Sequence, residues 1–355
     1  MAGTFVGRPQ EGVLMVETQA SGASSSSPLN EKAALAVRGL TISIPTARGP
    51  LHLVEKLDFS IAPGKTLCIV GESGSGKSIT ALALMRLLHN ALDITAGTVD
   101  LNGTELLGLS NKEMRKVRGA GMSMIFQEPM TSLNPAYTVG NQIVEAITTH
   151  RSLSAEAART EAVRLLREVN IPAPEQRLDA YPHQLSGGMR QRVMIALALA
   201  NNPSVLIADE PTTALDVTVQ AQILELMRNL RSRYGASVIF ITHDLGVVRE
   251  IADDVLVLYA GRVMEYARAQ DIFENPQHPY TLGLFAALPN GRSREPLTVI
   301  PGLVPMVGQF PKGCRFSTRC ALATEKCRME QPLLEDFGKG HRVACWYAPI
   351  ESTRP

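Results

Sequence analysis

Short segments near the start of the chain alternate between hydrophobic and polar positions, as strands with one buried face do. Two of them are Leu40-Thr41-Ile42-Ser43-Ile44 and Leu57-Asp58-Phe59-Ser60-Ile61. Pro45 and the run Arg48-Gly49-Pro50 separate the two segments and favour a turn between them. The alternation therefore predicts an antiparallel sheet over about residues 34–61.

Short continuous apolar runs form a second pattern, which indicates strands buried on both faces. These runs lie at 66–70, 204–208 and 237–241, and a helical pattern at 217–234 separates the last two. Strand, helix and strand at this spacing predict a parallel sheet with right-handed crossovers. Further helical patterns cover 78–88 and, interrupted by prolines, about 139–199.

The patterns divide the chain into three parts. Residues 1–32 contain a serine-rich stretch that buries too little apolar surface to offset the cost of ordering, so we expect a flexible tail. Residues 33–288 carry the α/β pattern and include a helical subdomain at about 136–200. Residues 289–355 form a small extension that contains prolines and cysteines.

The composition mainly serves to exclude some classes of protein. The 355 residues are 45% hydrophobic, which supports a substantial core, and the net charge of +1 provides no basic field for nucleic acid. The longest apolar runs, such as 193–200, are shorter than the roughly 20 residues that span a bilayer. Because the N-terminus lacks the pattern of a secretory signal, we expect the chain in the cytoplasm.

A glycine-rich run directly follows the apolar segment at 66–70. Such a loop turns backbone N–H groups around a phosphate, and the next helix points its positive dipole end at the same anion. We expect Lys77 to reach the β- and γ-phosphates of a nucleoside triphosphate, and the Ser78 hydroxyl to complete a Mg²⁺ shell. The expected nucleotide contacts are Gly71, Ser73, Gly74, Ser75, Gly76, Lys77, Ser78 and Ile79.

Two acids, Asp209 and Glu210, follow the buried run at 204–208. We expect Asp209 to hold the metal or its water, and Glu210 to polarise the water that attacks the γ-phosphate. An Asp-Glu pair after a strand is equally compatible with a simple turn. The phosphate loop elsewhere in the chain is what favours the catalytic interpretation.

Between these motifs stands the run Leu185-Ser186-Gly187-Gly188-Met189-Arg190-Gln191, and here the chain resembles the ATP-binding subunits of ATP-binding-cassette (ABC) transporters. Serine and glycine backbone at a helix start is again a phosphate-binding surface. The resemblance implies the ABC fold, in which a P-loop NTPase core carries an antiparallel β subdomain and a helical subdomain. It also implies two cassettes packed head to tail, with one closing on the ATP of the other through Ser186, Gly187, Gly188 and Gln191.

Other family positions map onto single residues of this chain. Gln127 matches the glutamine that contacts Mg²⁺ and senses the transmembrane partner, and the run Ala214-Leu215-Asp216 matches the loop that communicates across the dimer. His243 matches the switch histidine that contacts the γ-phosphate and holds the attacking water. Ile44 stands where the family usually stacks an aromatic ring on adenine, so we expect weaker adenine contact, or replacement by His52.

Longer stretches narrow the resemblance to bacterial dipeptide and oligopeptide importers, namely those at 126–135, 181–184, 209–222 and 278–281. The resemblance implies a peripheral ATPase on the cytoplasmic face of the inner membrane. Its implied partners are two transmembrane permease subunits, a second and usually related ABC ATPase, and an extracytoplasmic substrate-binding protein. Nickel and glutathione importers of the same branch are alternatives. A soluble ABC ATPase of DNA repair or translation is disfavoured because the chain has no long coiled coil and no second cassette.

Four of the five cysteines, Cys314, Cys320, Cys327 and Cys345, cluster in the C-terminal extension. In a reducing cytoplasm, such a group favours a bound metal over disulfides. Zinc sites usually have closer cysteine pairs, whereas a larger cluster tolerates wider spacing. The pattern resembles a module of peptide-importer ATPases that is associated with a [4Fe-4S] cluster. Zinc and unliganded thiols remain alternatives, as does a role of the module in sensing oxidation or iron.

Overall fold

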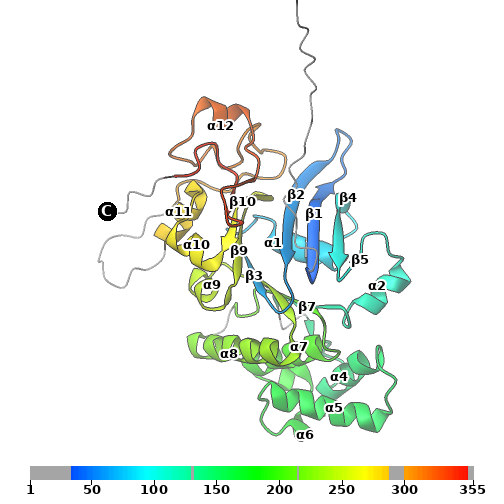
Figure 1. Cartoon of the computed structure of the whole chain (residues 1–355). Helices are drawn as coiled ribbons and strands as arrows, with labels where there is room; N and C mark the ends of the chain where they lie inside the picture. The colour runs from blue at the N-terminus through cyan, green and yellow to red at the C-terminus, as the bar shows by residue number, and fades with distance from the viewer. Residues whose placement is uncertain (1–32, 129–131, 214–215, 288–299, 351–355) are drawn as a thin grey trace, which may run out of the picture.

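Two sheets and a set of helices organise the part of the chain that the structure describes (Figure 1). This computed structural model describes residues 33–128, 132–213, 216–287 and 300–350. The tail expected at 1–32 lies outside the described residues. The combination of a mainly parallel sheet, an antiparallel sheet and a group of helices confirms the predicted α/β fold class.

The smaller sheet is antiparallel and has the strand order β2-β1-β4-β5. The alternation of the sequence predicts β1 and β2, but both strands extend further toward the N-terminus than predicted. The third strand, β4, is exposed over most of its first half, so its sequence carries no clear alternation. The strands are β1 (Leu35–Ile44), β2 (Leu51–Ile61), β4 (Asp93–Leu101) and β5 (Thr104–Glu105).

The larger sheet has the strand order β11-β12-β10-β9-β3-β8-β7-β6. The five strands from β9 to β6 run parallel to one another, and the other three add antiparallel pairs at one edge. The central strand β3 is buried along its whole length, as its continuous apolar sequence predicts. The strands are β3 (Thr66–Val70), β6 (Met122–Ile125), β7 (Val205–Asp209), β8 (Ser237–Ile241), β9 (Asp254–Tyr259), β10 (Arg262–Arg268), β11 (Glu335–Asp336) and β12 (Arg342–Val343).

Helices of the middle region gather on one side of the molecule (Figure 1). Ser154 and Ser186 begin two of them, because each serine hydroxyl accepts a hydrogen bond from the backbone N–H three residues later. Apolar side chains from α4, α5, α7 and α8 join one core cluster with the sheet. The elements are α4 (Val139–Thr148), α5 (Ala155–Glu168), α6 (Pro174–Arg177), η1 (Pro182–Gln184), α7 (Gly187–Leu199) and α8 (Val217–Tyr234).

The C-terminal region, which we call the cysteine module (residues 300–350), adds its strands to the edge of the main sheet. Strand β12 pairs with β10, and β11 pairs with β12. Within the described ranges, none of the helices combines the length and the apolar character needed to cross a bilayer. The remaining helices are α1 (Lys77–Leu84), α2 (Asn111–Val117), α9 (Leu245–Ile251), α10 (Ala269–Glu274), α11 (Pro279–Ala286) and α12 (Glu325–Met329).

Candidate nucleotide site

The phosphate loop connects the central strand β3 to helix α1. Gly71, Gly74 and Gly76 have φ angles of 152°, 78° and 103°, which disfavour other residues. A Cβ atom at Gly71 would also lie 2.1 Å from the Leu258 carbonyl oxygen, so no side chain fits there. Ser73 and Gly74 are exposed at the tip of the loop, where a ligand can reach them.

Lys77 is folded back onto the loop in this structure. Its ammonium group donates hydrogen bonds to the carbonyl oxygens of Gly71 at 2.7 Å and Glu72 at 3.0 Å. Burial lowers the pKa of Lys77, and the nearby carboxylates of Glu210, Asp209 and Glu72 act against that shift. The ammonium group is therefore held beside the loop, within the cradle that the sequence predicts.

Ser78 and Asp209 meet where β7 ends. The Ser78 hydroxyl donates a hydrogen bond of 3.1 Å to the Asp209 carboxylate. Burial is the largest influence on the pKa of Asp209 and raises it. A bound cation would offset that cost of burying the charge, so the hydroxyl and carboxylate fit the oxygen chemistry that Mg²⁺ prefers.

Two other predicted site residues, Gln127 and His243, lie beside the Glu210 carboxylate. It accepts hydrogen bonds from the Gln127 amide at 3.1 Å and the Thr213 hydroxyl at 2.9 Å, and His243 Nδ1 lies 3.4 Å away. Glu210 has a φ of 46°, an uncommon backbone conformation for a glutamate. Thus side chains that follow β6, β7 and β8 converge at one edge of the sheet, beside the phosphate loop.

The buried hydroxyl of Ser75 tests whether these residues fit a nucleotide. Ser75 is fully buried within the phosphate loop, and its oxygen has no hydrogen-bond partner among the described residues. A polar atom left unpaired in this way usually has a ligand or a water as its partner. Together with the ammonium group of Lys77 and the hydroxyl of Ser78, it fits a bound triphosphate with Mg²⁺.

The signature motif forms the start of helix α7. The Ser186 hydroxyl accepts a hydrogen bond of 3.3 Å from the Met189 N–H, and both Ser186 and Gly187 are exposed. Gln191 differs from its expected role, because it is 1% exposed and its side-chain nitrogen has no partner among the described residues. Its side chain therefore lies inside the protein rather than on the surface formed by residues 186–188.

Helix α8 begins at the position that the sequence assigns to communication across a dimer. Asp216 is exposed and caps this helix, accepting a hydrogen bond of 3.0 Å from the Val219 N–H. The neighbouring Ala214 and Leu215 lie outside the described residues, as does the segment 129–131 of the predicted motif after Gln127.

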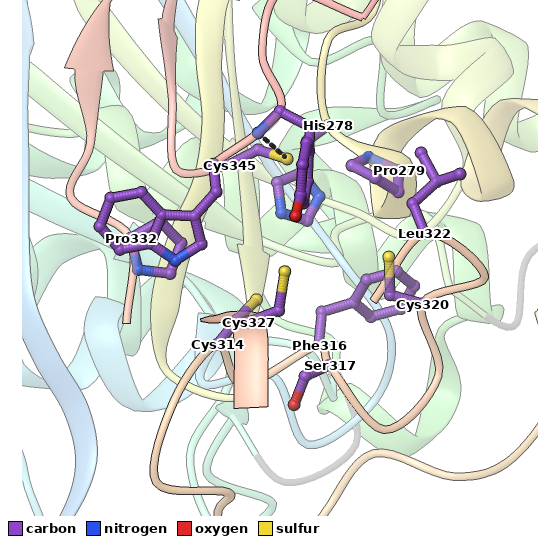
Figure 2. Close-up of a pocket in the computed structure, with 12 residues that line it drawn as sticks. His278, Pro279, Cys314, Phe316, Ser317, Cys320, Leu322, Cys327, Pro332 and Cys345 are labelled. Carbon is purple, nitrogen blue, oxygen red and sulfur yellow. Dashed lines mark hydrogen bonds between the residues drawn. The ribbon is translucent and has the colours of Figure 1, made fainter. Parts of the chain in front are cut away.

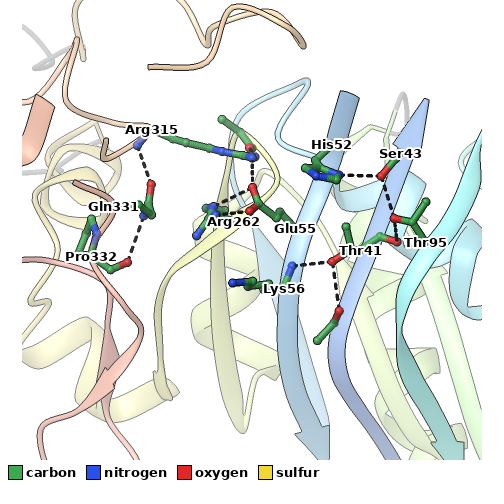
Figure 3. Close-up of polar contacts among 12 residues, drawn as sticks. Thr41, Ser43, His52, Glu55, Lys56, Thr95, Arg262, Arg315, Gln331 and Pro332 are labelled. Carbon is green, nitrogen blue, oxygen red and sulfur yellow. Dashed lines mark hydrogen bonds and ion pairs between the residues drawn. The ribbon is translucent and has the colours of Figure 1, made fainter. Parts of the chain in front are cut away.

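The position expected to contact adenine lies at the end of β1. Ile44 is half-buried there and pairs with Leu51 of β2. The ring of His52 accepts or donates a hydrogen bond of 2.8 Å with the Ser43 hydroxyl, which also contacts Thr95 (Figure 3). One ring nitrogen of His52 is therefore already hydrogen-bonded within the sheet.

The four clustered cysteines line one pocket of the cysteine module, as Figure 2 shows. The pocket has a volume of about 330 Å³, including the space at its open mouth, and His278 and Phe316 also line it. Burial raises the pKa of Cys314 to about 11; the hydrogen bond from the Phe316 backbone N–H acts against this shift, and the neighbouring thiols add to it. All four cysteine side chains therefore lie around one small space.

Sharing one pocket does not by itself make the four thiols a metal site. Among the described residues, no group of three or more His, Cys, Asp or Glu side chains is arranged to hold a metal ion. The donor set fits a cluster chemically, because four cysteine thiolates are the usual ligands of [4Fe-4S]. The arrangement of the sulfur atoms does not bear out the predicted cluster.

Several polar contacts around the site were not predicted from the sequence. The Thr213 hydroxyl contacts Glu210, and the Tyr280 hydroxyl accepts a hydrogen bond of 2.9 Å from the Glu72 N–H. Arg319 of the cysteine module pairs with the Glu72 carboxylate. Thr213 follows Glu210 closely and could have been found from that spacing, whereas nothing local in the sequence joins residues 72, 280 and 319.

Two family models and several known proteins are similar to this chain. A family model described as ABC transporter matches residues 54–213, and one described as oligopeptide/dipeptide transporter, C-terminal region, matches residues 264–327. The dipeptide transport ATP-binding protein DppD of Escherichia coli K12 is 47% identical over 324 residues, covering 91% of this chain and 99% of that protein. The oligopeptide transport ATP-binding protein OppD of Haemophilus influenzae is 49% identical over 313 residues, covering 88% and 96%.

Solved structures show the same architecture. The dimeric ATP-binding cassette MJ0796 in a post-hydrolysis state, bound to ADP and Pi, has a TM-score of 0.60 at 28% identity. The match covers 66% of this chain and 98% of that one. A second dimeric structure of MJ0796, described as a bacterial ABC transporter cassette, has a TM-score of 0.59.

Proposed function

This chain belongs to the ABC transporter family, as an ATPase subunit of the dipeptide and oligopeptide branch, and on that premise we propose that it energises import of small peptides. The observation that supports the proposal most is the convergence of Gln127, Glu210 and His243 beside the phosphate loop. Three separate strands deliver these side chains to one point, as hydrolysis of a bound nucleotide requires.

Each residue has a distinct part in the proposed hydrolysis. Lys77 leaves the loop carbonyls and donates to the β- and γ-phosphates, where its charge offsets the charge that develops during transfer. Glu210 accepts a proton from the attacking water, while His243 holds that water and contacts the γ-phosphate. Ser78, Asp209 and Gln127 would hold a Mg²⁺ ion, which supplies further neutralisation of the phosphates when bound.

The proposed assembly surrounds this site with further chains. The exposed surface at residues 186–188 closes on the nucleotide of a second ABC ATPase, and Asp216 lies on the same contact. We propose two transmembrane permease subunits as the membrane partners and an extracytoplasmic binding protein that delivers the peptide to them. The chain itself then sits peripherally on the cytoplasmic face of the inner membrane.

Deleting the gene should abolish uptake of a radiolabelled dipeptide by intact cells, because the permease would lose the ATPase that drives its conformational change. The measurement is the initial uptake rate, compared with a strain complemented by the full chain. Nickel and glutathione uptake are measured in the same strains. Loss of nickel or glutathione uptake with normal dipeptide uptake would assign the chain to a different substrate and contradict the peptide proposal.

We propose further that the cysteine pocket holds a [4Fe-4S] cluster in the mature protein. Four thiols around one pocket support this proposal, and ligation would move them together. Anaerobically purified protein should be brown and contain iron and sulfide, and Cys320→Ser should lose both. A Cys68→Ser variant is the matched control, because Cys68 is buried in β3, away from the pocket. A colourless wild-type protein that contains zinc would contradict the cluster.

A further inference from the structure

Glu72 places a carboxylate inside the phosphate loop, immediately after Gly71. A negative charge at this place repels the phosphates of a nucleotide unless it is paired. In this structure the carboxylate is paired with a guanidinium from the other end of the chain, that of Arg319. The cysteine module thus supplies a charge to the nucleotide site.

The pair between Glu72 and Arg319 has two parallel contacts. Arg319 Nη1 lies 2.5 Å from one carboxylate oxygen of Glu72, and Nη2 lies 3.0 Å from the other. The Arg319 side chain is only 5% exposed, and its Nε donates a hydrogen bond of 2.8 Å to the Pro301 carbonyl. A buried guanidinium with two fork-like contacts and a fixed third donor holds its partner in one orientation.

A second contact fixes the backbone of the same residue. The Glu72 N–H donates to the Tyr280 hydroxyl, and Tyr280 is fully buried. The ring of Phe316 packs against Tyr280, with ring centroids 5.3 Å apart. Phe316 and Arg319 belong to one turn, because the Arg319 N–H donates to the Phe316 carbonyl. One turn of the cysteine module therefore supports both the side chain and the backbone of Glu72.

Arg315 of the same turn supports the loop from another side. Its guanidinium donates to the Ala260 carbonyl and pairs with Glu55 of β2 (Figure 3). The next residue, Gly261, donates its N–H to the Ser75 carbonyl at 2.8 Å. The phosphate loop is therefore held at Glu72 by Arg319 and at Ser75 by Gly261, the residue after the one that Arg315 contacts.

We infer that Arg319 is a positioning residue for ATP binding, which neutralises Glu72 and holds the phosphate loop in the shape that accepts the nucleotide. The inference rests on the proposed function, because it concerns the same site. Without the guanidinium, the Glu72 carboxylate would face the phosphates unpaired. The loop would also lose its side-chain anchor, while Tyr280 would still hold its backbone.

The test is a titration of the full chain with Mg²⁺ and a fluorescent ATP analogue, mant-ATP. Arg319→Ala should weaken binding by about tenfold at low salt, and the difference should shrink as added salt screens the carboxylate. Adding Glu72→Gln to Arg319→Ala should restore affinity to within about threefold of the wild type, because the repelling charge is gone. A merely structural role of Arg319 would not be relieved by this second change.

Two further variants keep the test decisive. Glu72→Gln alone should bind mant-ATP at least as tightly as the wild type, because the carboxylate charge is gone and the amide oxygen can still accept a hydrogen bond from Arg319. Arg342→Ala removes a guanidinium that packs over Tyr266, so it serves as the matched control with unchanged affinity.

The outcomes separate the inference from the proposed function. A wild-type chain that binds no mant-ATP would overturn the proposed function itself. If the wild type binds but Arg319→Ala binds equally well, the inference is wrong. The same holds if the double variant stays as weak as Arg319→Ala, or if Glu72→Gln weakens binding on its own.

Discussion

Replacing Glu210 with glutamine should lower ATP turnover by about 10²- to 10⁴-fold while ATP remains bound. Glutamine has nearly the same shape, so it can still accept hydrogen bonds from Gln127 and Thr213 through its amide oxygen. It cannot take a proton from the attacking water at neutral pH. The phosphate loop, Lys77 and Ser78 are unchanged, so binding contacts persist after hydrolysis has been lost.

The measurement has two parts, made on the chain assembled with the second ABC ATPase that we propose as its partner. Phosphate release gives the turnover, and gel filtration in Mg-ATP gives the bound nucleotide and the size of the assembly. The closed, ATP-bound pair of cassettes should accumulate in the variant. Glu225→Gln is the control, because Glu225 is an exposed glutamate on α8 that has no part in the proposed hydrolysis. Residual turnover close to the wild-type rate would show that Glu210 is not the general base.

Replacing Lys77 with alanine should weaken ATP binding by about 100-fold, and turnover should fall with it. The Lys77 side chain is a buried cation beside the loop, with the carboxylates of Glu210, Asp209 and Glu72 around it. Its removal leaves these carboxylates facing the phosphates without the positive charge. The loop carbonyls of Gly71 and Glu72 also lose their donor.

Equilibrium titration with mant-ATP measures this loss directly, and a thermal melt without nucleotide checks the fold. Lys112→Ala, at an exposed position in α2, is the matched control. Binding and turnover, measured together, distinguish the Lys77 and Glu210 variants. Lys77→Ala loses binding, whereas Glu210→Gln keeps binding and loses turnover. Unchanged affinity of Lys77→Ala would contradict its assignment to the phosphates.

Elements with strong local patterns were predictable from the sequence almost to the residue. Helix α8 and strand β8 have the bounds that the sequence predicts, because an Asp cap, a terminal Gly and a continuous apolar run mark their ends. Strand β4 was not predicted, because its exposed first half has no apolar alternation. Strands β11 and β12 are only two residues long and exist through pairing with β10, a tertiary contact that no local pattern records.

Part of the candidate site could likewise be predicted from the sequence, and part could not. Gln127, Asp209, Glu210 and His243 follow predicted or neighbouring strands, so the parallel topology alone brings them to one edge of the sheet. The pair between Glu72 and Arg319 could not be predicted, since it depends on how the cysteine module folds back. The same folding buries Cys314 and Cys327 more deeply than Cys320 and Cys345, a difference absent from their spacing.

The pairing of β12 with β10 has a consequence for the order in which the protein is made. Strand β10 lies within the cassette, yet its outer neighbour is contributed by residues 342–343, which come much later in the sequence. During translation, the ribosome releases β10 long before β12 exists. The nascent cassette therefore emerges with an open strand edge, on which another growing chain can pair. The edge of β10 at Glu265 and Tyr266 is covered only after residues 342–343 have been made.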